Sequence, residues 1–436
     1  MKHLFPIVSL CGAIVLAGCG SSSSSSSSDD SSSGDTVSNT VPVIAGDANT
    51  TASTGQLYSF TPTAGDADGD ALTFSIENKP DWADFNASNG ALTGTPTAYG
   101  ATADINISVS DGEDTASLPL FTLTVYERVK ATGQVKSYDD DGEANTTIKD
   151  DGYYQAGTPL DYERDDDLGI VTDNVTGLMW QDDADVTEDV NMFNDDYTAV
   201  YSVTTGCDAV NAKALGGYSD WRVPTIEELL TFVDFSTPDV NPRVVENTVS
   251  ASITQTLTNA WSDEDISRVS WTFTDGRTIN SVYAAYGQVR CVRGDTLNTD
   301  NALSRDDESG IVTDAKTGLM WQDDANITAM MDWNAAVAQC EAMTLGGYDN
   351  WRLPNFSEMV SITDFDAETV KTGFVNADGL DYFWTATATL QSNAVYTYNP
   401  FVYRFDPNGT GAAKFTNYYY TRTEGSFKAM CVRTIE

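Results

Sequence analysis

Acidic side chains at alternate positions offer the clearest chemistry in this sequence. Asp66, Asp68 and Asp70 alternate along an Asp-x-Asp-Gly-Asp turn, where three carboxylates can converge on one hard cation. Asp111 and Asp114, in a second acidic turn, can complete the shell of oxygen ligands. We therefore predict a candidate calcium site at these five residues. The alternative is a solvated turn, rich in Asp and Gly, that binds no ion.

Histidine chemistry is excluded once the leader peptide is removed. The single histidine, His3, lies within the first nineteen residues. Without imidazole, Ser-His-Asp and Cys-His catalysis are unavailable, and so are His-based zinc and haem sites. The paired carboxylates of a glycosidase remain, but a chain with 65 acidic residues contains such pairs by chance. We assign no catalytic residue and expect no enzyme.

The N-terminus has the features of an export and anchoring signal. An apolar stretch over 4–16 follows a short positive start and is too short to span a bilayer. Ala17 and Gly18 precede Cys19, which resembles the lipobox of bacterial lipoproteins, in which cleavage leaves the cysteine acylated. An ordinary secretory signal with a chance cysteine is the alternative. Gly20 replaces the aspartate that retains lipoproteins at the inner membrane, so we expect an outer-membrane or cell-surface location.

The charge balance limits the partners. The 436 residues include 65 Asp and Glu against 23 Lys and Arg, a formal net charge of −42. Nucleic acids and bare anionic lipid surfaces bind through Lys and Arg. We therefore expect no nucleic-acid partner, and membrane contact only through the lipid anchor. Hydrophobic residues make up 41 % of the chain, which is enough for folded cores.

Three sequence blocks recur in the C-terminal half and define a first and a second copy of one domain. The blocks are 164–184 with 305–325, 215–224 with 345–354, and 291–293 with 431–433. Their offsets of 141, 130 and 140 residues are too long for a solenoid unit and indicate duplicated whole domains with loop insertions.

The cysteines are shared equally between the copies. Six cysteines, less Cys11 in the signal and Cys19 under lipid, leave Cys207, Cys291, Cys340 and Cys431. Because an exported protein meets an oxidising compartment, we expect two disulfides. The simplest pairing stays within each copy, Cys207–Cys291 and Cys340–Cys431, and stabilises each by about 4 kcal/mol on the chain-entropy model.

Each copy contains signals for helices beside a small sheet. The segment 170–180 consists of two apolar runs around a Thr-Gly turn, which predicts a hairpin. The segment 333–340 places Trp333 and Cys340 on one helical face. A second helix follows Thr225 in the first copy and Asn355 in the second, each with Glu at capping-box spacing. The expected fold of each copy is α+β, with two helices beside an antiparallel sheet.

The recurring motifs resemble a known family. Gly-Leu-Met-Trp-Gln, Trp-Arg-Val/Leu-Pro-x-x-x-Glu and a closing Cys-Val-Arg, each present twice over 129–436, are similar to the C-terminal domain of the Legionella collagen-like adhesin. The resemblance implies a fold similar to C-type lectins and a role in binding host or matrix glycans. This chain departs from the family in lacking a collagen-like segment and in its strongly acidic charge. The Glu-Pro-Asn or Gln-Pro-Asp calcium–sugar motif of C-type lectins is also missing.

The stretch 41–127 has a different pattern. Short strand-forming runs alternate with turns such as Asp68-Gly69, Asn89-Gly90 and Asp111-Gly112, which predicts a β-sandwich of seven strands. Its motifs resemble bacterial Ig-like and dystroglycan-type cadherin-like modules, which imply a spacer or adhesive stalk.

Together these features predict a multi-domain chain with an all-β sandwich followed by two α+β lectin-like domains. The expected segments are a signal peptide (1–18), a lipidated Ser-rich tether (19–40), the sandwich (41–127), a lead-in (128–168), the first copy (169–295), a linker (296–310) and the second copy (311–436). We expect a lipid-anchored, non-catalytic surface adhesin that binds glycans or extracellular matrix. A structural envelope protein without a ligand and a carboxylate-based glycan-cleaving enzyme are the alternatives.

Overall fold

A computed structural model provides the coordinates. It describes residues 38–138, 144–182, 189–191, 207–222, 224–231, 233–235, 243–244, 254–257, 269–272, 278–279, 286–288, 291–297, 300–364, 369–377, 382–391, 397–404, 414–416, 423 and 425–435. The predicted signal peptide, Cys19 and most of the Ser-rich tether lie outside these residues. Within them, no helix has the length and apolar character needed to cross a membrane.

The N-terminal module is an Ig-like β-sandwich of short strands. The strands are β1 Val43–Ala45, β2 Thr51–Ser53, β3 Tyr58–Phe60, β4 Thr63–Gly65, β5 Thr73–Glu77, β6 Ala83–Asn86, β7 Ala91–Gly94, β8 Gly100–Ser110, β9 Thr115–Ser117 and β10 Phe121–Tyr126. The larger sheet has the order β2-β10-β8-β5 with β9 on β8, a second sheet is β3-β7-β6, and β1 pairs with β4. Alternate residues of β8 (Ile105, Ile107 and Val109) are fully buried between the sheets, as the period-two pattern predicts.

The first copy is built on a four-stranded antiparallel sheet of order β11-β12-β13-β21. Its elements are β11 Tyr162–Asp165, β12 Ile170–Asp173, β13 Met179–Gln181, β14 Asp189–Asn191, α2 Asp208–Lys213, the 3-10 turn Leu215–Gly217, α3 Ile226–Leu230, β15 Val233–Asp234, β16 Arg243–Val244, β17 Thr254–Leu257, β18 Val269–Thr272, β19 Thr278–Ile279, β20 Tyr286–Gln288 and β21 Val292–Arg293. The predicted hairpin is β12–β13.

The second copy repeats this sheet as β22-β23-β24-β32. Its elements are β22 Leu303–Asp306, β23 Ile311–Asp314, β24 Leu319–Gln322, the 3-10 turn Ala325–Thr328, β25 Met330–Met331, α4 Trp333–Glu341, α5 Phe356–Ser361, β26 Thr363–Asp364, β27 Thr369–Val370, β28 Tyr382–Gln391, β29 Thr397–Arg404, β30 Lys414–Thr416, β31 Phe427–Lys428 and β32 Val432–Thr434. Strands β11 and β22 lie in the expected lead-in and linker, so each sheet begins one strand before the boundary placed from the sequence. Both copies are rich in short strands and contain few helices.

The two copies share one hydrophobic core. Trp180 and Val292 of the first copy belong to the same cluster of fully buried residues as Trp321 and Val432, their equivalents in the second. Phe235 and Phe356 meet between the copies with ring centroids 5.3 Å apart. Because burial of apolar area is the main stabilising term in folding, the copies form one folded head rather than two independent beads.

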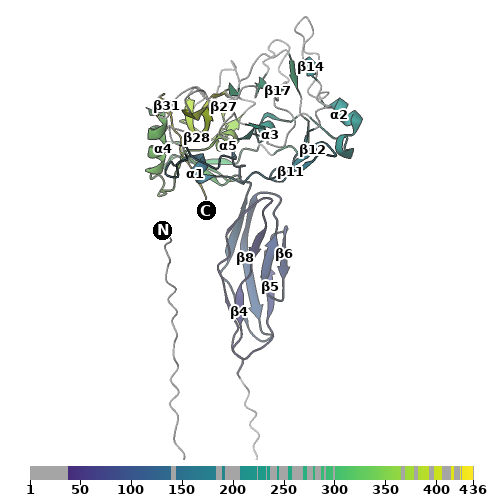
Figure 1. Ribbon diagram of the computed structural model, residues 1–436. Helices are drawn as coiled ribbons and strands as arrows, with labels where there is room; N and C mark the ends of the chain where they lie inside the picture. The colour runs from purple at the N-terminus through teal and green to yellow at the C-terminus, as the bar shows by residue number, and fades with distance from the viewer. Residues whose placement is uncertain are drawn as a thin grey trace, which may run out of the picture.

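The lead-in crosses the head instead of simply connecting two modules. Lys130 Nζ donates to Asp173 Oδ2 of the first copy at 2.6 Å. Farther along, the short helix α1 (Asp151–Tyr154) lies beside β28 of the second copy (Figure 1). Nearer the start of the lead-in, Gln134 Oε1 accepts a hydrogen bond from Ala388 N of β28 at 2.9 Å. The lead-in therefore ties the two copies together.

The sandwich is attached to the second copy, although the first copy follows it in the chain. Glu127 N donates to Lys316 O at 2.7 Å. Arg128 donates through Nη1 to Gly318 O at 3.3 Å and through Nη2 to Ile435 O at 3.1 Å. Figure 1 shows the result, a stalk with the head lying across its end.

Candidate functional site

The acidic turn at 66–70 folds around one carboxylate. Asp66 Oδ1 accepts hydrogen bonds from the backbone N–H groups of Asp68, Gly69 and Asp70 at 2.8, 2.9 and 3.2 Å. Carboxylate oxygens of the three aspartates lie within 4.8 Å of one another. An all-oxygen set of this kind suits Ca²⁺, and calcium binding at this turn stays a prediction.

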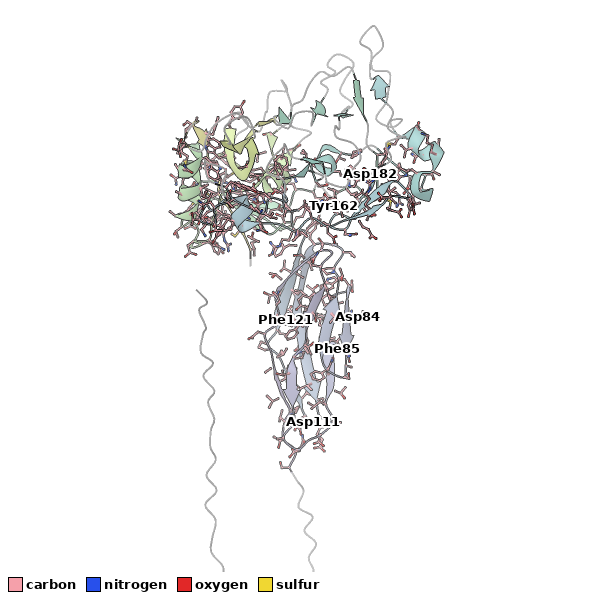
Figure 2. All side chains as sticks on the ribbon, viewed as in Figure 1. Asp84, Phe85, Asp111, Phe121, Tyr162 and Asp182 are labelled. Carbon is pink, nitrogen blue, oxygen red and sulfur yellow. A yellow bond between two sulfur atoms is a disulfide. The ribbon has the colours of Figure 1, made fainter. Side chains whose placement is uncertain are left out.

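Asp111 and Asp114 lie outside this group of three carboxylates. Each accepts a hydrogen bond from Asn39 Nδ2 at 3.0 Å. Asp111 also accepts from the backbone N–H groups of Asp114 and Glu113, which lower the pKa of its carboxyl. The structure thus gathers three of the five predicted ligands, and the other two hold the chain where it enters the sandwich. Figure 2 shows Asp111 at the tip farthest from the head.

Each copy closes on its own disulfide. Cys207 bonds to Cys291 with an S–S distance of 2.01 Å, and Cys340 bonds to Cys431 with 1.99 Å. The pairing is the one that the repeats predict. It leaves no thiol among the described cysteines for redox or nucleophilic chemistry.

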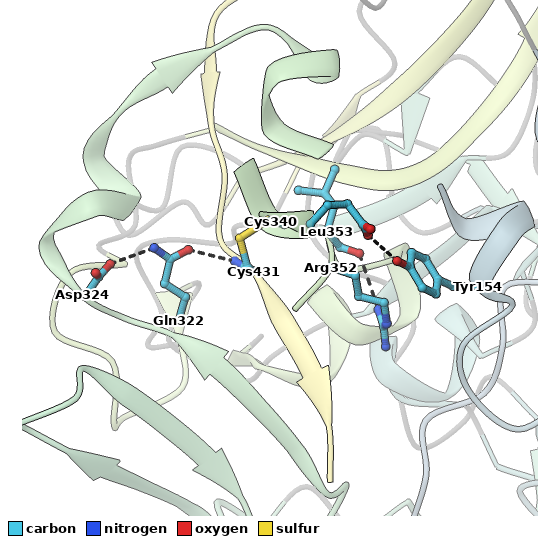
Figure 3. Close-up of a disulfide and its surroundings, with 8 residues drawn as sticks. Tyr154, Gln322, Asp324, Cys340, Arg352, Leu353 and Cys431 are labelled. Atoms are coloured by element: carbon cyan, nitrogen blue, oxygen red, sulfur yellow. Dashed lines mark hydrogen bonds between the residues drawn. A yellow bond between two sulfur atoms is a disulfide. The ribbon is translucent and has the colours of Figure 1, made fainter. Parts of the chain in front are cut away.

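A glutamine beside each bridge supports its C-terminal cysteine. Gln322 Oε1 accepts from Cys431 N at 3.2 Å, and its Nε2 donates to Asp324 Oδ1 at 2.8 Å (Figure 3). Gln181 repeats the first contact, accepting from Cys291 N at 3.1 Å. The glutamine of the Gly-Leu-Met-Trp-Gln motif is therefore structural.

The Trp-Arg-x-Pro-x-x-x-Glu motif forms an ion pair that also caps a helix. Arg222 donates to both carboxylate oxygens of Glu228 at 2.7 Å, and Arg352 holds Glu358 in the same way. The N-cap residues of the two helices are Thr225 and Asn355, and each exchanges hydrogen bonds with its glutamate. The recurring tryptophans are at most 3 % exposed and belong to the core: Trp180, Trp221, Trp321 and Trp351. These motifs build the framework of each copy.

An exposed tyrosine stacked on an arginine recurs in both copies. In the first platform, the Arg293 guanidinium carbon lies 3.7 Å from the centre of the Tyr218 ring. In the second platform, Arg433 lies 4.0 Å from the Tyr348 ring. The tyrosines are 36 % and 40 % exposed. A solvent-facing ring backed by a cation is a feature of binding surfaces, because aromatic and Arg side chains supply apolar area and directed donors together.

The platforms differ in the residue two positions after the tyrosine. In the first, Asp220 accepts from Arg293 Nε at 2.8 Å and from its Nη2 at 3.1 Å, and these bonds lower the pKa of the Asp220 carboxyl. In the second, Arg433 Nε donates to the amide oxygen of Asn350 at 2.7 Å. The sequence analysis missed this site. Gly-Gly-Tyr and Cys-Val-Arg both recur, but only the β-bridges Arg222–Val292 and Arg352–Val432 show that they meet.

A buried carboxyl lies where the lead-in meets the second copy. Asp151 is 2 % exposed, and its Oδ2 accepts hydrogen bonds from the Thr132 and Thr387 hydroxyls. Burial raises the pKa of Asp151 to about 7, against the opposing effect of those hydrogen bonds. Asp151 Oδ1 also accepts from Asn355 Nδ2 at 3.4 Å, so this carboxyl joins the lead-in to the second copy.

Comparison with known proteins identifies two kinds of domain in this chain. Residues 169–293 and 310–433 each match the family described as Lcl C-terminal domain. The chain belongs to the Lcl C-terminal domain family. Residues 41–126 match the family described as Putative Ig domain. The Lcl domains therefore cover the disulfide and the platform of each copy, and the sheet from its second strand onward. No curated protein matches the chain.

Solved structures give only distant likenesses. An α-galactosidase-type protein from Bacteroides fragilis is 13 % identical over 19 % of this chain and 17 % of its own, with a TM-score of 0.17. The SrpA adhesin from Streptococcus sanguinis is 14 % identical over 34 % of this chain and 90 % of its own, with a TM-score of 0.19. Human protocadherin-24 EC1-2 is 16 % identical over 33 % and 77 %, with a TM-score of 0.17. These low scores support no argument about the Lcl domains.

Proposed function

We propose that this chain is a lipid-anchored, non-catalytic adhesin of the outer membrane or cell surface that binds glycans or extracellular matrix. The observation that carries the proposal is the layout of the molecule: two Lcl domains joined through one core at the end of an Ig-like stalk (Figure 1). Such a head presents two related surfaces at a fixed separation. For each Lcl domain we propose a C-type-lectin-like fold.

Cys19 supplies the anchor in this proposal. Acylation at the start of a Ser-rich tether places the stalk clear of the membrane and leaves the head free to contact a surface. The test is Cys19→Ser, which should release the protein from membranes into the soluble fraction. Membrane association with an unmodified N-terminus would contradict the anchor.

The charge of the chain decides between kinds of glycan. At a net charge of −42, steering of densely sulfated polymers is repulsive. We therefore propose weak, salt-tolerant binding to neutral or calcium-bridged glycans, or to matrix protein. If both copies reach one surface, avidity raises the apparent affinity about a hundredfold.

The decisive experiment is retention of the purified chain on immobilised glycan and matrix surfaces, with and without EDTA and added salt. Retention that survives salt supports the proposal, and its loss in EDTA assigns a role to calcium. Tight heparin retention that salt abolishes would contradict the charge argument. Release of shortened glycan would identify an enzyme, and no retention on any surface would favour a structural envelope protein.

A further inference from the structure

The two platforms have the same geometry and different charge. In the first, the exposed Asp220 carboxylate neutralises Arg293. In the second, an amide takes the place of that carboxylate, and the nearest acid in the chain is Asp349, one position earlier. Asp349 forms no ion pair with Arg433, whose recorded partners are Asn350, Met320 and the Tyr348 ring. Among the described residues, the positive charge of the second platform therefore has no carboxylate partner.

Arg433 differs from the other arginines of the described part of the chain in having no acidic partner there. Seven arginines there have described side chains, and five of them pair with a carboxylate: Arg164, Arg222, Arg293, Arg305 and Arg352. Arg128 donates to three backbone carbonyls instead. Only Arg433 of these seven has neither a carboxylate nor a backbone carbonyl as acceptor among the described residues, in a protein with almost three acidic residues for every basic one.

Burial makes the missing partner informative. Arg433 is 7 % exposed, so water compensates little of its charge. Buried charges in proteins are normally paired, because desolvation without a counter-charge is costly. Its Nη2 has no hydrogen-bond partner among the described residues and is not one of their buried unpaired atoms, so this nitrogen is in contact with solvent. A small anion can approach there.

The residues around Arg433 indicate which kind of molecule carries the anionic group. The Tyr348 ring is 40 % exposed and can stack against the apolar face of a sugar ring. Asn350 is exposed, and its amide group can bond to hydroxyls. A guanidinium binds a carboxylate through directed hydrogen bonds. One cation matches one isolated carboxylate, whereas a densely sulfated polymer meets the repulsion of the whole chain.

We propose that the second platform (Tyr348, Asn350 and Arg433) binds the carboxylate of an acidic sugar, and that the first platform, neutralised by Asp220, does not. The inference rests on the proposed glycan-binding function and assigns a ligand class to one of its two surfaces. The duplicated domains thus differ in specificity through one exchange of acid for amide.

The test exchanges the charges of the two platforms in the full-length chain. Methyl glucuronide and methyl glucoside, which share a ring and differ in the carboxylate, are titrated and followed by saturation-transfer NMR. The unchanged chain should bind the glucuronide about tenfold more tightly than the glucoside, as expected for one charge-assisted contact. Asn350→Asp should abolish this preference, and Asp220→Asn should create a second site for the glucuronide. Both positions are exposed, and melting curves verify that each variant folds.

Several results would overturn the inference. They are unchanged glucuronide binding in Asn350→Asp, equal binding of the two glycosides, and acetate or an acidic peptide binding as tightly as the glucuronide. Retention on neutral glycan surfaces with no effect of Asn350→Asp would remove this inference and leave the adhesive function standing. Failure of the chain to bind any surface would remove the proposed function itself.

Discussion

The first and second copies have the same interior and different surroundings. Their hairpins pair in the same register, Ile170 with Gln181 and Ile311 with Gln322. The second copy is covered by the lead-in and joined to the stalk, so its Arg352 side chain is 8 % exposed whereas that of Arg222 is 29 % exposed. The recurring motifs therefore preserve one framework. The segments that pack against a copy from outside the repeat determine how deeply that copy is buried.

The largest expected effect tests what the copies share. Replacing Cys340 and Cys431 by serine should lower the free energy of unfolding by about 4–5 kcal/mol, because the closed loop is long. Replacing Cys207 and Cys291 should cost nearly the same, since the sequence separations are 91 and 84 residues. Denaturant unfolding measures both losses, and non-reducing peptide mapping checks the pairing. A bridge between the copies would disprove the duplicated framework.

The next effect should separate the copies. Arg352→Met leaves Glu358 charged and buried, which should cost about 3 kcal/mol. Arg222→Met should cost less, about 2 kcal/mol, because the Arg222 side chain is 29 % exposed and water can enter beside the buried Glu228 that remains. The measurement is again denaturant unfolding. The matched control is Arg352→Met combined with Glu358→Met, which should recover part of the loss. Equal losses at Arg222 and Arg352 would show that covering by the lead-in has no energetic consequence.

A smaller difference is expected at the turn before each platform. Gly216 and Gly346 both have left-handed backbones, with φ of 62° and 60°, so alanine should cost about 1 kcal/mol at either. A Cβ at Gly346 would lie 2.3 Å from Ile311 Cδ1, whereas at Gly216 the nearest atom is 3.3 Å away. Because Ile311 is buried and must move, Gly346→Ala should cost about 1 kcal/mol more. Thermal melts compare the two variants.

The remaining effect depends on pH and concerns the contact between the lead-in and the second copy. The folded-state pKa of Asp151 is raised to about 7 from an ordinary value near 3.8. Its stabilising contribution is therefore complete below pH ~4 and is lost as pH rises toward 7. Asp151→Asn cannot ionise, so it should raise Tm by several degrees at pH 8 and leave it unchanged at pH 4. The control is the exposed Asp84→Asn, which should change Tm at neither pH.

Local features of the fold follow from the sequence, and contacts between distant segments do not. The β12–β13 hairpin, the capped helices after Thr225 and Asn355, and the buried tryptophans all follow from short-range patterns of apolar and capping residues. The shared core and the route of the lead-in depend on side chains that meet only after folding, so periodicity cannot reveal them.

The candidate sites show the same limit. Asp66, Asp68 and Asp70 are neighbours in the chain, and their convergence can be predicted. Tyr348 and Arg433 are separated by 85 positions, and nothing local marks them as partners. Comparing the two copies with each other would have revealed the exchange of Asp220 for Asn350, but its meaning required the position of the arginine.

The joint between stalk and head also determines how the molecule responds to mechanical load. Arg128 donates hydrogen bonds to the carbonyl oxygens of Gly318, directly before β24, and of Ile435, directly after β32. Tension along the stalk therefore loads these hydrogen bonds first, and after they break it passes along the covalent chain through the lead-in into the first copy. The first disulfide on that path is Cys207–Cys291, so extension of the chain from the stalk should stop at Cys207. Single-molecule stretching, with and without reductant, measures that stop directly.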